Sequence, residues 1–290
     1  MHPAPSLIVF TALSGFGFGL MAWLGVLGSL PPERFAALAV LALAAAGAGL
    51  LASVAHLGNP QRAWRAFSQW QSSWLSREGL AALAAMAVFF VHAGLAYLGR
   101  PLPGLGWLAS GLALVTILCT AMIYAQLKTV PRWHTRLTPL LFALFALSSA
   151  AIAIAPGWAA IPLLAATGLV QWRHWAAGDV GLAASAVDAA SATGLSGQIR
   201  VLAHPHTGPN YLLDEMVFRF ARKRAEALRR LVMIGGILLP ALLLLAFMAF
   251  DPPAALLAVP LGLHLTGTAL SRWLFFAEAT HTVSLYYGRA

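Results

Sequence analysis

The sequence predicts an all-α, polytopic integral membrane protein, in which residues 1–290 form a single membrane domain, a bundle of about eight transmembrane helices. Two observations predict this class. Apolar residues make up 60% of the chain and charged residues only 9%, whereas an ordinary soluble domain has roughly 25% charged residues. The apolar residues also gather in runs of about 20, the length that a helix needs to cross the hydrocarbon core of a bilayer.

Eight such runs follow one another along the chain. We expect transmembrane helices at about 7–30, 35–57, 78–99, 105–127, 138–156, 158–175, 231–250 and 254–276. The third and the seventh are the clearest, because 80–98 and 231–250 contain no Asp, Glu, Lys or Arg. The first run lacks a charged segment before it and is too long for the apolar part of a signal peptide, so we interpret it as a retained helix.

Positive charges gather in the loops on one side of the predicted bundle. The loops 58–77, 128–137 and 173–230 hold three, three and eight Lys or Arg residues, whereas the opposite loops hold only Arg34 and Arg100. Loops rich in Lys and Arg tend to stay in the cytoplasm. We therefore expect a bacterial inner-membrane protein with these loops and both termini in the cytoplasm. A basic face that binds an acidic partner is a second interpretation, and it is compatible with the first.

The segment 176–230 is the one long stretch outside the predicted membrane helices. Its last part, 215–230, mixes apolar residues such as Phe218 and Leu228 with basic residues such as Arg222 and Lys223. This pattern predicts a basic amphipathic helix at the anionic lipid surface, and docking to a protein partner is the alternative. The basic residues therefore point to membrane lipid, not nucleic acid, as a partner.

Redox centres within the chain itself are restricted by its single cysteine. Cys119 alone cannot form a disulfide within the chain, and an iron–sulfur cluster needs several thiolates. The glycines at 15, 17 and 19 lie inside a predicted span and do not follow a strand, so they are not a nucleotide-binding loop. We interpret Gly15 and Gly19 as a pair that allows close packing of helices.

Ionisable side chains at membrane depth are candidate functional groups, because burying them is costly unless they are used or paired. His56 ends the second predicted span and Glu78 opens the third, so both lie at the same membrane face. A histidine can take a proton near neutral pH, and a carboxylate can pass it to water. Oxidation of a quinol releases two protons and two electrons, so a quinone site needs such a base. A helix-end histidine bonded to a carbonyl, and a carboxylate favoured by the helix dipole, are the structural alternatives.

Two further groups of residues allow other interpretations. His92 and His264 lie deep in predicted spans and are candidate axial ligands for a b-type haem, although a lone histidine in a membrane is more often hydrogen-bonded to a neighbour. Tryptophans near the span ends are typical of the interfacial aromatic belt. Three of them also offer an apolar roof for a quinone ring: Trp64, Trp70 and Trp74.

Several short strings resemble the membrane anchor subunits of dimethyl sulfoxide reductase-type molybdoenzymes. They are HPAPS at 2–6, HLGNPQRAW at 56–64, SSWLSRE at 72–78, TGPNYL at 207–212 and RWLFFAEA at 272–279. The resemblance runs through the whole chain in order, and the family has eight spans. It also includes the anchors of sulfite-oxidising complexes.

The resemblance implies a complex of three subunits. A molybdopterin catalytic subunit would exchange electrons with a four-cluster iron–sulfur subunit, and this chain would anchor both and exchange electrons with ubiquinone or menaquinone, without haem or an iron–sulfur cluster of its own. In the family, the histidine of the His-Leu-Gly string and the glutamate that opens the third span are implicated in quinol binding. These residues correspond to His56 and Glu78. With their neighbours, the predicted quinone-binding residues are His56, Arg62, Trp74, Arg77 and Glu78.

The basic face favours catalytic partners in the cytoplasm, which is typical of the sulfite-oxidising complexes of this family. Sulfite oxidation to sulfate with quinone reduction is therefore the leading expectation. The alternative is the menaquinol-oxidising anchor of a dimethyl sulfoxide, S-oxide or N-oxide reductase. A secondary transporter is a more remote alternative, because such proteins often carry inverted repeats and none is evident here. A purely structural anchor without a quinone site also remains open.

Overall fold

The computed structural model describes residues 3–27, 30–55, 57–154, 157–181, 188–197, 199, 224–250 and 253–287. These residues form helices, turns and connecting segments, and no strand occurs among them. The long helices are α1 (Pro5–Leu24), α2 (Pro32–Ala55), α3 (Trp74–Tyr97), α4 (Pro103–Ala125), α5 (Leu137–Ile154), α6 (Ala160–Asp179) and α12 (Ala258–Ala277). A further long helix is composed of α10 (Ala225–Met233), the π-helical turn η2 (Ile234–Leu238) and α11 (Leu239–Phe250). Short elements are η1 (Pro60–Gln69), α8 (Ala189–Thr193), η3 (Ala254–Leu257) and η4 (Thr282–Tyr287).

The predicted all-helical membrane class is confirmed. Seven helical segments in the described part of the chain are long and apolar enough to cross a membrane. The predicted count of eight is not confirmed, because α6 is not among the seven. This helix lies where the sixth span was expected, but its last turns carry polar residues, including Gln171, Arg173 and His174. The first helix also ends at Leu24, earlier than the expected residue 30.

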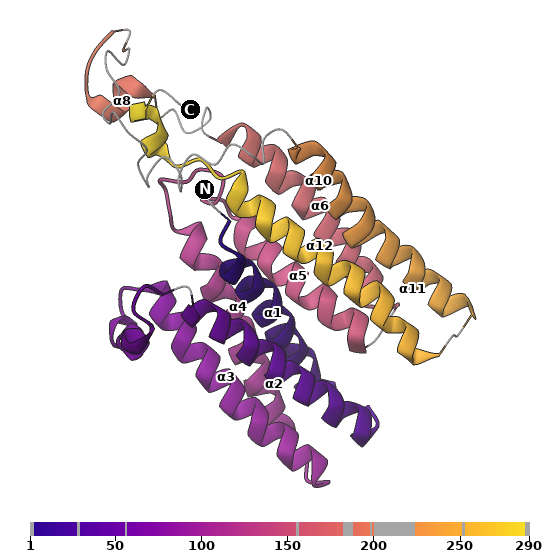
Figure 1. Cartoon of the computed structure of the whole chain (residues 1–290). Coiled ribbons are helices and arrows are strands. Elements are labelled where there is room, and N and C mark those ends of the chain that lie inside the picture. The colour runs from indigo at the N-terminus through magenta and orange to yellow at the C-terminus, as the bar shows by residue number, and fades with distance from the viewer. Residues whose placement is uncertain are drawn as a thin grey trace.

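Helix α1 lies at the centre of the molecule. It packs against α2, α4, α5 and α12, and it is the most deeply buried of the seven apolar helices. In Figure 1, α2, α3 and α4 lie on one side of it, and α6, α10, α11 and α12 lie on the other. The largest hydrophobic core is built around α1, and a second one joins α5 and α6 to η2 and α11.

Two glycines allow α1 to approach its neighbours closely. A Cβ atom on Gly17 would collide with the backbone of Ala46 on α2, and one on Gly19 would collide with the backbone of Ala146 on α5. At Gly15 an added Cβ would make only an ordinary contact, 3.9 Å from the Cβ of Ala146. The predicted role in close helix packing is thus confirmed for Gly19. Gly17 has the same role, although it was not predicted, whereas Gly15 leaves room for a side chain. Small residues are typical of such membrane helix interfaces.

The π-helical turn η2 follows from the proline next to it. Pro240 has no N–H, so it cannot donate to the carbonyl of Gly236 four residues earlier. The helix widens, and Leu239 N–H bonds to the carbonyl of Ile234. The Gly236 carbonyl faces Nδ1 of His264 on α12 at 2.7 Å. A carbonyl only accepts hydrogen bonds, so Nδ1 carries the proton, and Nε2 accepts from Ser148 at 2.9 Å. The Nδ1–H group of His264 thus replaces the backbone N–H that Pro240 cannot offer to the Gly236 carbonyl.

Four charged side chains join the ends of three helices. Arg132, in the loop after α4, donates to Asp179 at the end of α6 and to Glu278 at the end of α12, at 2.6 and 3.1 Å. Arg229 on α10 donates to the same two carboxylates, at 2.7 and 2.9 Å. These four residues are called the charge cluster below. Hydrogen bonds from Arg229 and Arg132 lower the pKa of the Asp179 carboxyl to about 2.

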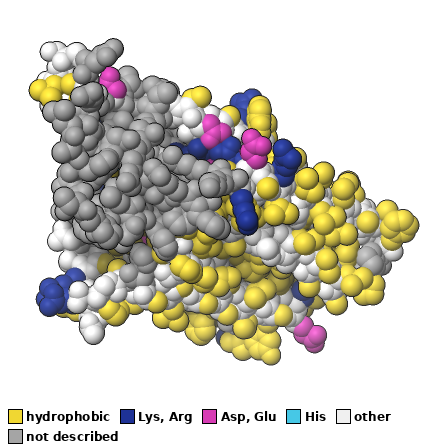
Figure 2. Space-filling view, turned by 45° about the horizontal axis from the view of Figure 1, so that its top comes forward, with side chains coloured by type: hydrophobic (Ala, Val, Ile, Leu, Met, Phe, Trp, Pro, Cys, Tyr) yellow, Lys and Arg dark blue, Asp and Glu magenta, His cyan; other side chains and the backbone are white. Residues whose placement is uncertain are grey.

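The distribution of side chains on the surface fits a protein surrounded by lipid. In Figure 2, hydrophobic side chains cover most of the described surface on the right, whereas charged side chains gather toward the grey region. Of the predicted amphipathic segment 215–230, only 224–230 lies within the described residues. There it forms the start of α10 and thus the first turns of the apolar helix Ala225–Phe250.

Candidate functional site

Glu78 is the buried acid of the candidate site. It lies in the second turn of α3, and only 3% of its surface is exposed. The Thr120 hydroxyl on α4 donates a hydrogen bond to its carboxyl and also contacts the backbone carbonyl of Thr116. Thr120 was not predicted from the sequence. In the sequence Thr120 is one of several hydroxyl-bearing residues of α4, with Ser110, Thr116 and Tyr124, and no local pattern distinguishes it.

The start of α3 is held by its own side chains. Ser73 caps the helix, because its hydroxyl accepts from the N–H of Ser76 at 3.4 Å. The guanidinium group of Arg77 donates to the carbonyls of Trp70 and Gln71, at 2.8 and 2.5 Å, and stacks 4.5 Å from the ring centre of Trp74. Arg77 and Trp74 therefore form one unit that fixes the turn leading into α3.

The short helix η1 folds back over this turn. The hydroxyl of Ser76 donates to the carbonyl of Ala66, and the ring of Phe67 lies where a side chain on Gly79 would be, 2.9 Å from an added Cβ. Trp64 and Trp70 are exposed, at 66% and 54%. The exposed aromatic residues of this segment thus lie near the start of α3, the end of the helix that carries Glu78.

The structure brings together part of the predicted quinone site. Trp74, Arg77 and Glu78 lie together in the first two turns of α3. Arg62 lies on η1 with an exposed side chain, and no described interaction joins it to the other three. His56 falls outside the described residues, directly after the end of α2 at Ala55.

A carboxyl buried in this way is suited to proton exchange. Charge on a buried carboxylate is costly unless it is hydrogen-bonded, and a hydroxyl such as that of Thr120 can either donate to it or accept from it. Glu78 can therefore bind or release a proton without losing its partner. The segment η1 packs on the same end of α3, through the contacts of Ala66 with Ser76 and of Phe67 with Gly79.

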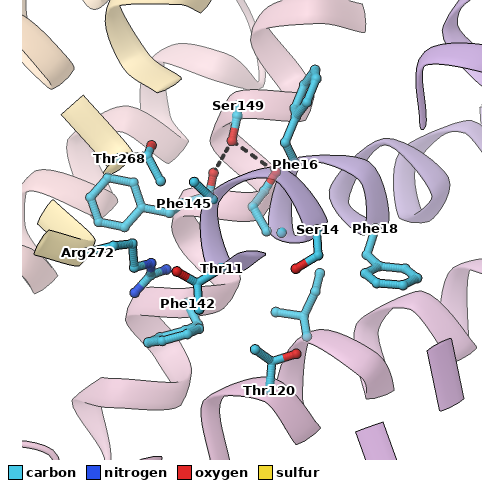
Figure 3. A pocket seen from close by; sticks show the side chains of 14 residues that line it. Thr11, Ser14, Phe16, Phe18, Thr120, Phe142, Phe145, Ser149, Thr268 and Arg272 are labelled. Atoms are coloured by element: carbon cyan, nitrogen blue, oxygen red, sulfur yellow. Dashed lines mark hydrogen bonds between the residues drawn. The ribbon is translucent and has the colours of Figure 1, made fainter. Parts of the chain in front are cut away.

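Thr120 also faces a small internal cavity. Figure 3 shows it there with Thr11 and Ser14 of α1 and with Arg272 of α12, which together line part of the cavity wall. The cavity volume is about 10 Å³, room for about one water molecule. Arg272 is 1% exposed, and its guanidinium carbon lies 3.5 Å from the ring centre of Phe142. Its Nε and Nη1 make no hydrogen bond to any residue that the structure describes.

The two histidines considered for haem differ in their surroundings. Both ring nitrogens of His264 have partners, the carbonyl of Gly236 and the hydroxyl of Ser148, which argues against an axial-ligand role for this residue. His92 lies between the rings of Phe35 and Phe89. Among the described residues, no group of three or more His, Cys, Asp or Glu side chains could hold a metal ion.

Comparison with known proteins identifies the family. Residues 1–278 match the model of the family described as DMSO reductase anchor subunit (DmsC). The chain belongs to this family. It is an anchor subunit, a membrane-embedded chain of a dimethyl sulfoxide reductase-type complex, as the resemblance in its sequence had implied.

One relative of this anchor subunit is named as a sulfite dehydrogenase subunit, and two are named as chains of dimethyl sulfoxide reductases. The C subunit of sulfite dehydrogenase from Allochromatium vinosum is 31% identical, over 99% of each protein. Anaerobic dimethyl sulfoxide reductase chain YnfH of Escherichia coli is 40% identical over 37% of the anchor subunit and 38% of its own length. The C chain of anaerobic dimethyl sulfoxide reductase from the same species is 33% identical over 33% and 35%.

The strings that resembled the family have distinct positions in the anchor subunit. SSWLSRE forms the turn into α3 and supplies the capping serine, the stacked Trp74–Arg77 pair and the buried Glu78. RWLFFAEA ends α12 and supplies Arg272 to the cavity and Glu278 to the charge cluster. TGPNYL at 207–212 lies outside the described residues.

Proposed function

We propose that this anchor subunit passes electrons between a quinone in the membrane and an iron–sulfur partner, within a complex that oxidises sulfite to sulfate. The full-length similarity to the sulfite dehydrogenase subunit of Allochromatium vinosum carries this proposal, because it covers 99% of both proteins. The similarity to the two dimethyl sulfoxide reductase proteins covers only about a third of either sequence.

The chemistry of the proposed reaction assigns a task to Glu78. Oxidation of sulfite with water yields sulfate, two protons and two electrons, and reduction of a quinone to a quinol consumes two electrons and two protons. Because the bilayer excludes water, protons must reach the quinone oxygens through side chains. Glu78 lies at the end of an apolar helix, and its hydrogen bond to Thr120 keeps its carboxyl in one orientation. It donates a proton to the quinone and regains one from the nearby aqueous face.

The neighbouring residues assist in binding. The Trp74 ring and the Arg77 guanidinium form a rigid stack at the entrance, suited to packing against a planar ring. We assign His56 to the second quinone oxygen, because it follows α2 directly and η1 connects it to α3. Arg62, exposed on η1, is assigned to the anionic lipid surface or to the mouth of the site.

The partners are proposed from the family and from the charge distribution. A molybdopterin catalytic subunit and a four-cluster iron–sulfur subunit complete the complex, and both lie on the cytoplasmic side of a bacterial inner membrane. In Figure 1 the beginning of α1 and the end of α12 lie at one end of the bundle. The charge cluster ties Arg132, Arg229 and Glu278 together at the end of α12, and such a face suits a protein partner.

The first experiment is purification of the complex through a tag on this chain, followed by assay in proteoliposomes. We expect sulfite-dependent reduction of a quinone analogue, abolished by Glu78→Gln, whereas sulfite-dependent reduction of a soluble dye is retained. Equal quinone reduction by Glu78→Gln and wild type would disprove the role of Glu78. Dimethyl sulfoxide reduction with menaquinol, and no activity with sulfite, would favour the second function, which the 40% identity to YnfH supports.

A further inference from the structure

The cavity that Thr120 faces is lined by polar side chains from four helices. Thr120 on α4 and Arg272 on α12 lie in its wall, together with four further hydroxyl groups from α1, α5 and α12: Thr11, Ser14, Ser149 and Thr268. The cavity volume is about 10 Å³, room for about one water molecule. Polar groups of different helices therefore surround a space that a single small molecule fills.

Arg272 brings a positive charge to this cavity without an acid beside it. None of the described ion pairs includes Arg272, and its guanidinium group stacks on Phe142, 3.5 Å from the ring centre. Figure 3 shows this group pointing from α12 toward Thr11. Nε and Nη1 are fully enclosed, so Nη2 is the nitrogen that can reach the cavity. A guanidinium nitrogen only donates hydrogen bonds, and the occupant of the cavity must therefore accept one.

The hydroxyl groups around the cavity already use their hydrogens elsewhere. Thr11 and Ser14 donate to carbonyls one turn earlier in α1, at 2.8 and 2.6 Å. Ser149 and Thr268 likewise donate to carbonyls one turn earlier in their own helices. A hydroxyl has one hydrogen, so these four oxygens offer only lone pairs to the cavity.

These hydrogen-bond directions identify the occupant. It must accept a hydrogen bond from Arg272 and donate hydrogen bonds to hydroxyl oxygens. An anion such as chloride accepts but cannot donate, and a cation is repelled by the guanidinium group. Water both accepts and donates, and buried waters typically make about three hydrogen bonds to otherwise unsatisfied polar groups.

We propose that one water molecule binds in this cavity, accepts a hydrogen bond from Nη2 of Arg272 and donates one to the hydroxyl oxygen of Thr120. The guanidinium group turns the hydrogens of the water away from itself and toward Thr120. The hydroxyl hydrogen of Thr120 then cannot point into the cavity and stays with its protein partners, the Glu78 carboxyl and the Thr116 carbonyl. Arg272 is thus a positioning residue for Glu78, and it acts through the water and Thr120.

The positioning role rests on the proposed function, because it concerns the orientation of the proposed proton donor. The water site does not rest on it and follows from the cavity and its hydrogen bonds. Each part therefore has its own measurement.

The water site is tested by a structure of the intact complex in lipid nanodiscs, at a resolution that shows ordered water. We expect density for one water within hydrogen-bond distance of both Nη2 of Arg272 and Oγ1 of Thr120. The density should be lost in Arg272→Met, which keeps the length of the side chain without a donor, and in Thr120→Val. A cavity without density in wild type, or a water that contacts only one of the two residues, would overturn the proposal. So would a halide in the cavity, recognised by the anomalous signal of bromide in crystals of the complex.

The positioning role is tested by a double-mutant cycle on quinone-linked turnover in proteoliposomes. We expect Arg272→Met and Thr120→Val each to lower turnover about fivefold, the effect of about one hydrogen bond. The double variant should also lose about fivefold, because both substitutions break the same chain. Two independent residues would give about 25-fold instead, and this result would contradict the role of Arg272.

Thr268→Val is the matched control for the cycle. Thr268 lines the same cavity one turn before Arg272, and its hydroxyl bonds to a carbonyl of its own helix. It should keep wild-type turnover, and a fall equal to that of Arg272→Met would show that any change in the cavity wall has the same effect. Dye-linked sulfite oxidation should be unchanged in all these variants. Full quinone turnover in Glu78→Gln would disprove the proposed function, whereas the water density would still decide the water site.

Discussion

The hydroxyl of Thr120 on α4 donates a hydrogen bond to the carboxyl of Glu78 on α3. This bond joins two helices that pack extensively along their length, and it is made between buried side chains, where an unsatisfied polar group costs about 1–3 kcal/mol. The same threonine lines the cavity into which Arg272 points. Glu78 is therefore connected to the interior of the bundle through one side chain.

Replacement of Glu78 by glutamine tests its role as a proton donor. Glutamine keeps the shape and can still accept from Thr120, but it cannot exchange a proton. We expect assembly and dye-linked sulfite oxidation to be retained, and quinone-linked turnover to fall at least about 100-fold, which is in the range lost with a general acid–base group. Proteoliposomes with a quinone analogue provide the measurement. A fall in dye-linked activity of the same size would instead indicate a damaged complex.

Replacement of Thr120 by valine tests whether the hydrogen bond orients Glu78. Valine has nearly the same shape and lacks the hydroxyl. Loss of about 1 kcal/mol of hydrogen bonding predicts a fall of about fivefold in quinone-linked turnover. The matched control is Thr116→Val, one turn earlier on α4, because the only bond of its hydroxyl to a described residue is to the carbonyl of Leu112 in its own helix. Equal effects of the two substitutions would contradict a specific role for Thr120.

Replacement of Glu278 by glutamine tests the charge cluster. Glu278 bonds to Arg132 and Arg229, and its side chain is only 5% exposed. Removal of this carboxylate leaves Asp179 as the only described acid for two arginines. We expect a loss of stability of about 1–3 kcal/mol, below the range for fully buried pairs because the arginines are partly exposed. Thermal unfolding in detergent is the measurement.

An exposed ion pair on α10 provides the control for that experiment. Glu226 and Arg230 are 86% and 76% exposed and lie 3.6 Å apart. Such pairs contribute about 0–1 kcal/mol, so Glu226→Gln should leave the unfolding temperature nearly unchanged. If both substitutions lower it equally, the charge cluster has no special structural role.

Acid should weaken the charge cluster through Asp179, which lies at the end of α6 outside the seven apolar helices. Hydrogen bonds from Arg229 and Arg132 lower its pKa from 3.8 to about 2. A carboxyl with a lowered pKa in the folded state stabilises the fold fully above its unfolded pKa, and this contribution is lost as the pH falls toward the folded pKa. We expect the wild type to lose more stability than Asp179→Asn below about pH 4, and the difference between the two to be constant from neutral pH down to about pH 5.

Two adjacent glycines in η2 test the helix contact to α12. A Cβ on Gly236 would lie 2.7 Å from the Cα of Gly267, whereas a Cβ on Gly235 would meet nothing within 4 Å. Overpacking of this kind costs about 1–3 kcal/mol. We therefore expect Gly236→Ala to lower the unfolding temperature and Gly235→Ala to leave it unchanged or raise it. The opposite order would mean that α12 does not pack on η2 as described.

The membrane class and the positions of the helices could be predicted because they depend on composition and run length, which need no knowledge of packing. The predicted count of eight is not confirmed at 158–175, where Arg173 and His174 place polar groups in the last turns of α6. Hydropathy alone does not show that the end of this helix meets partners such as Arg132 and Arg229 at Asp179. The sequence alone does not distinguish polar residues that pair with charged groups of other helices from polar residues that end a transmembrane span.

The candidate site could be predicted only in part. Glu78, Arg77 and Trp74 are adjacent in the sequence, so one helix start brings them together. Thr120 is 42 residues away from Glu78, and its role depends on the register between α3 and α4, which no local pattern specifies. His56 stays a prediction, because it lies outside the described residues.

The π-helical turn has a consequence for the biosynthesis of the protein. Pro240 deprives the Gly236 carbonyl of its usual donor, and His264, on the next helix to be synthesised, supplies one. In a bilayer, a carbonyl without a donor costs several kcal/mol. The segment Ala225–Phe250 is thus less stable alone in lipid than its hydropathy suggests, and it gains from the arrival of α12. The two helices should therefore enter the bilayer together as a hairpin, so that His264 reaches the Gly236 carbonyl during insertion.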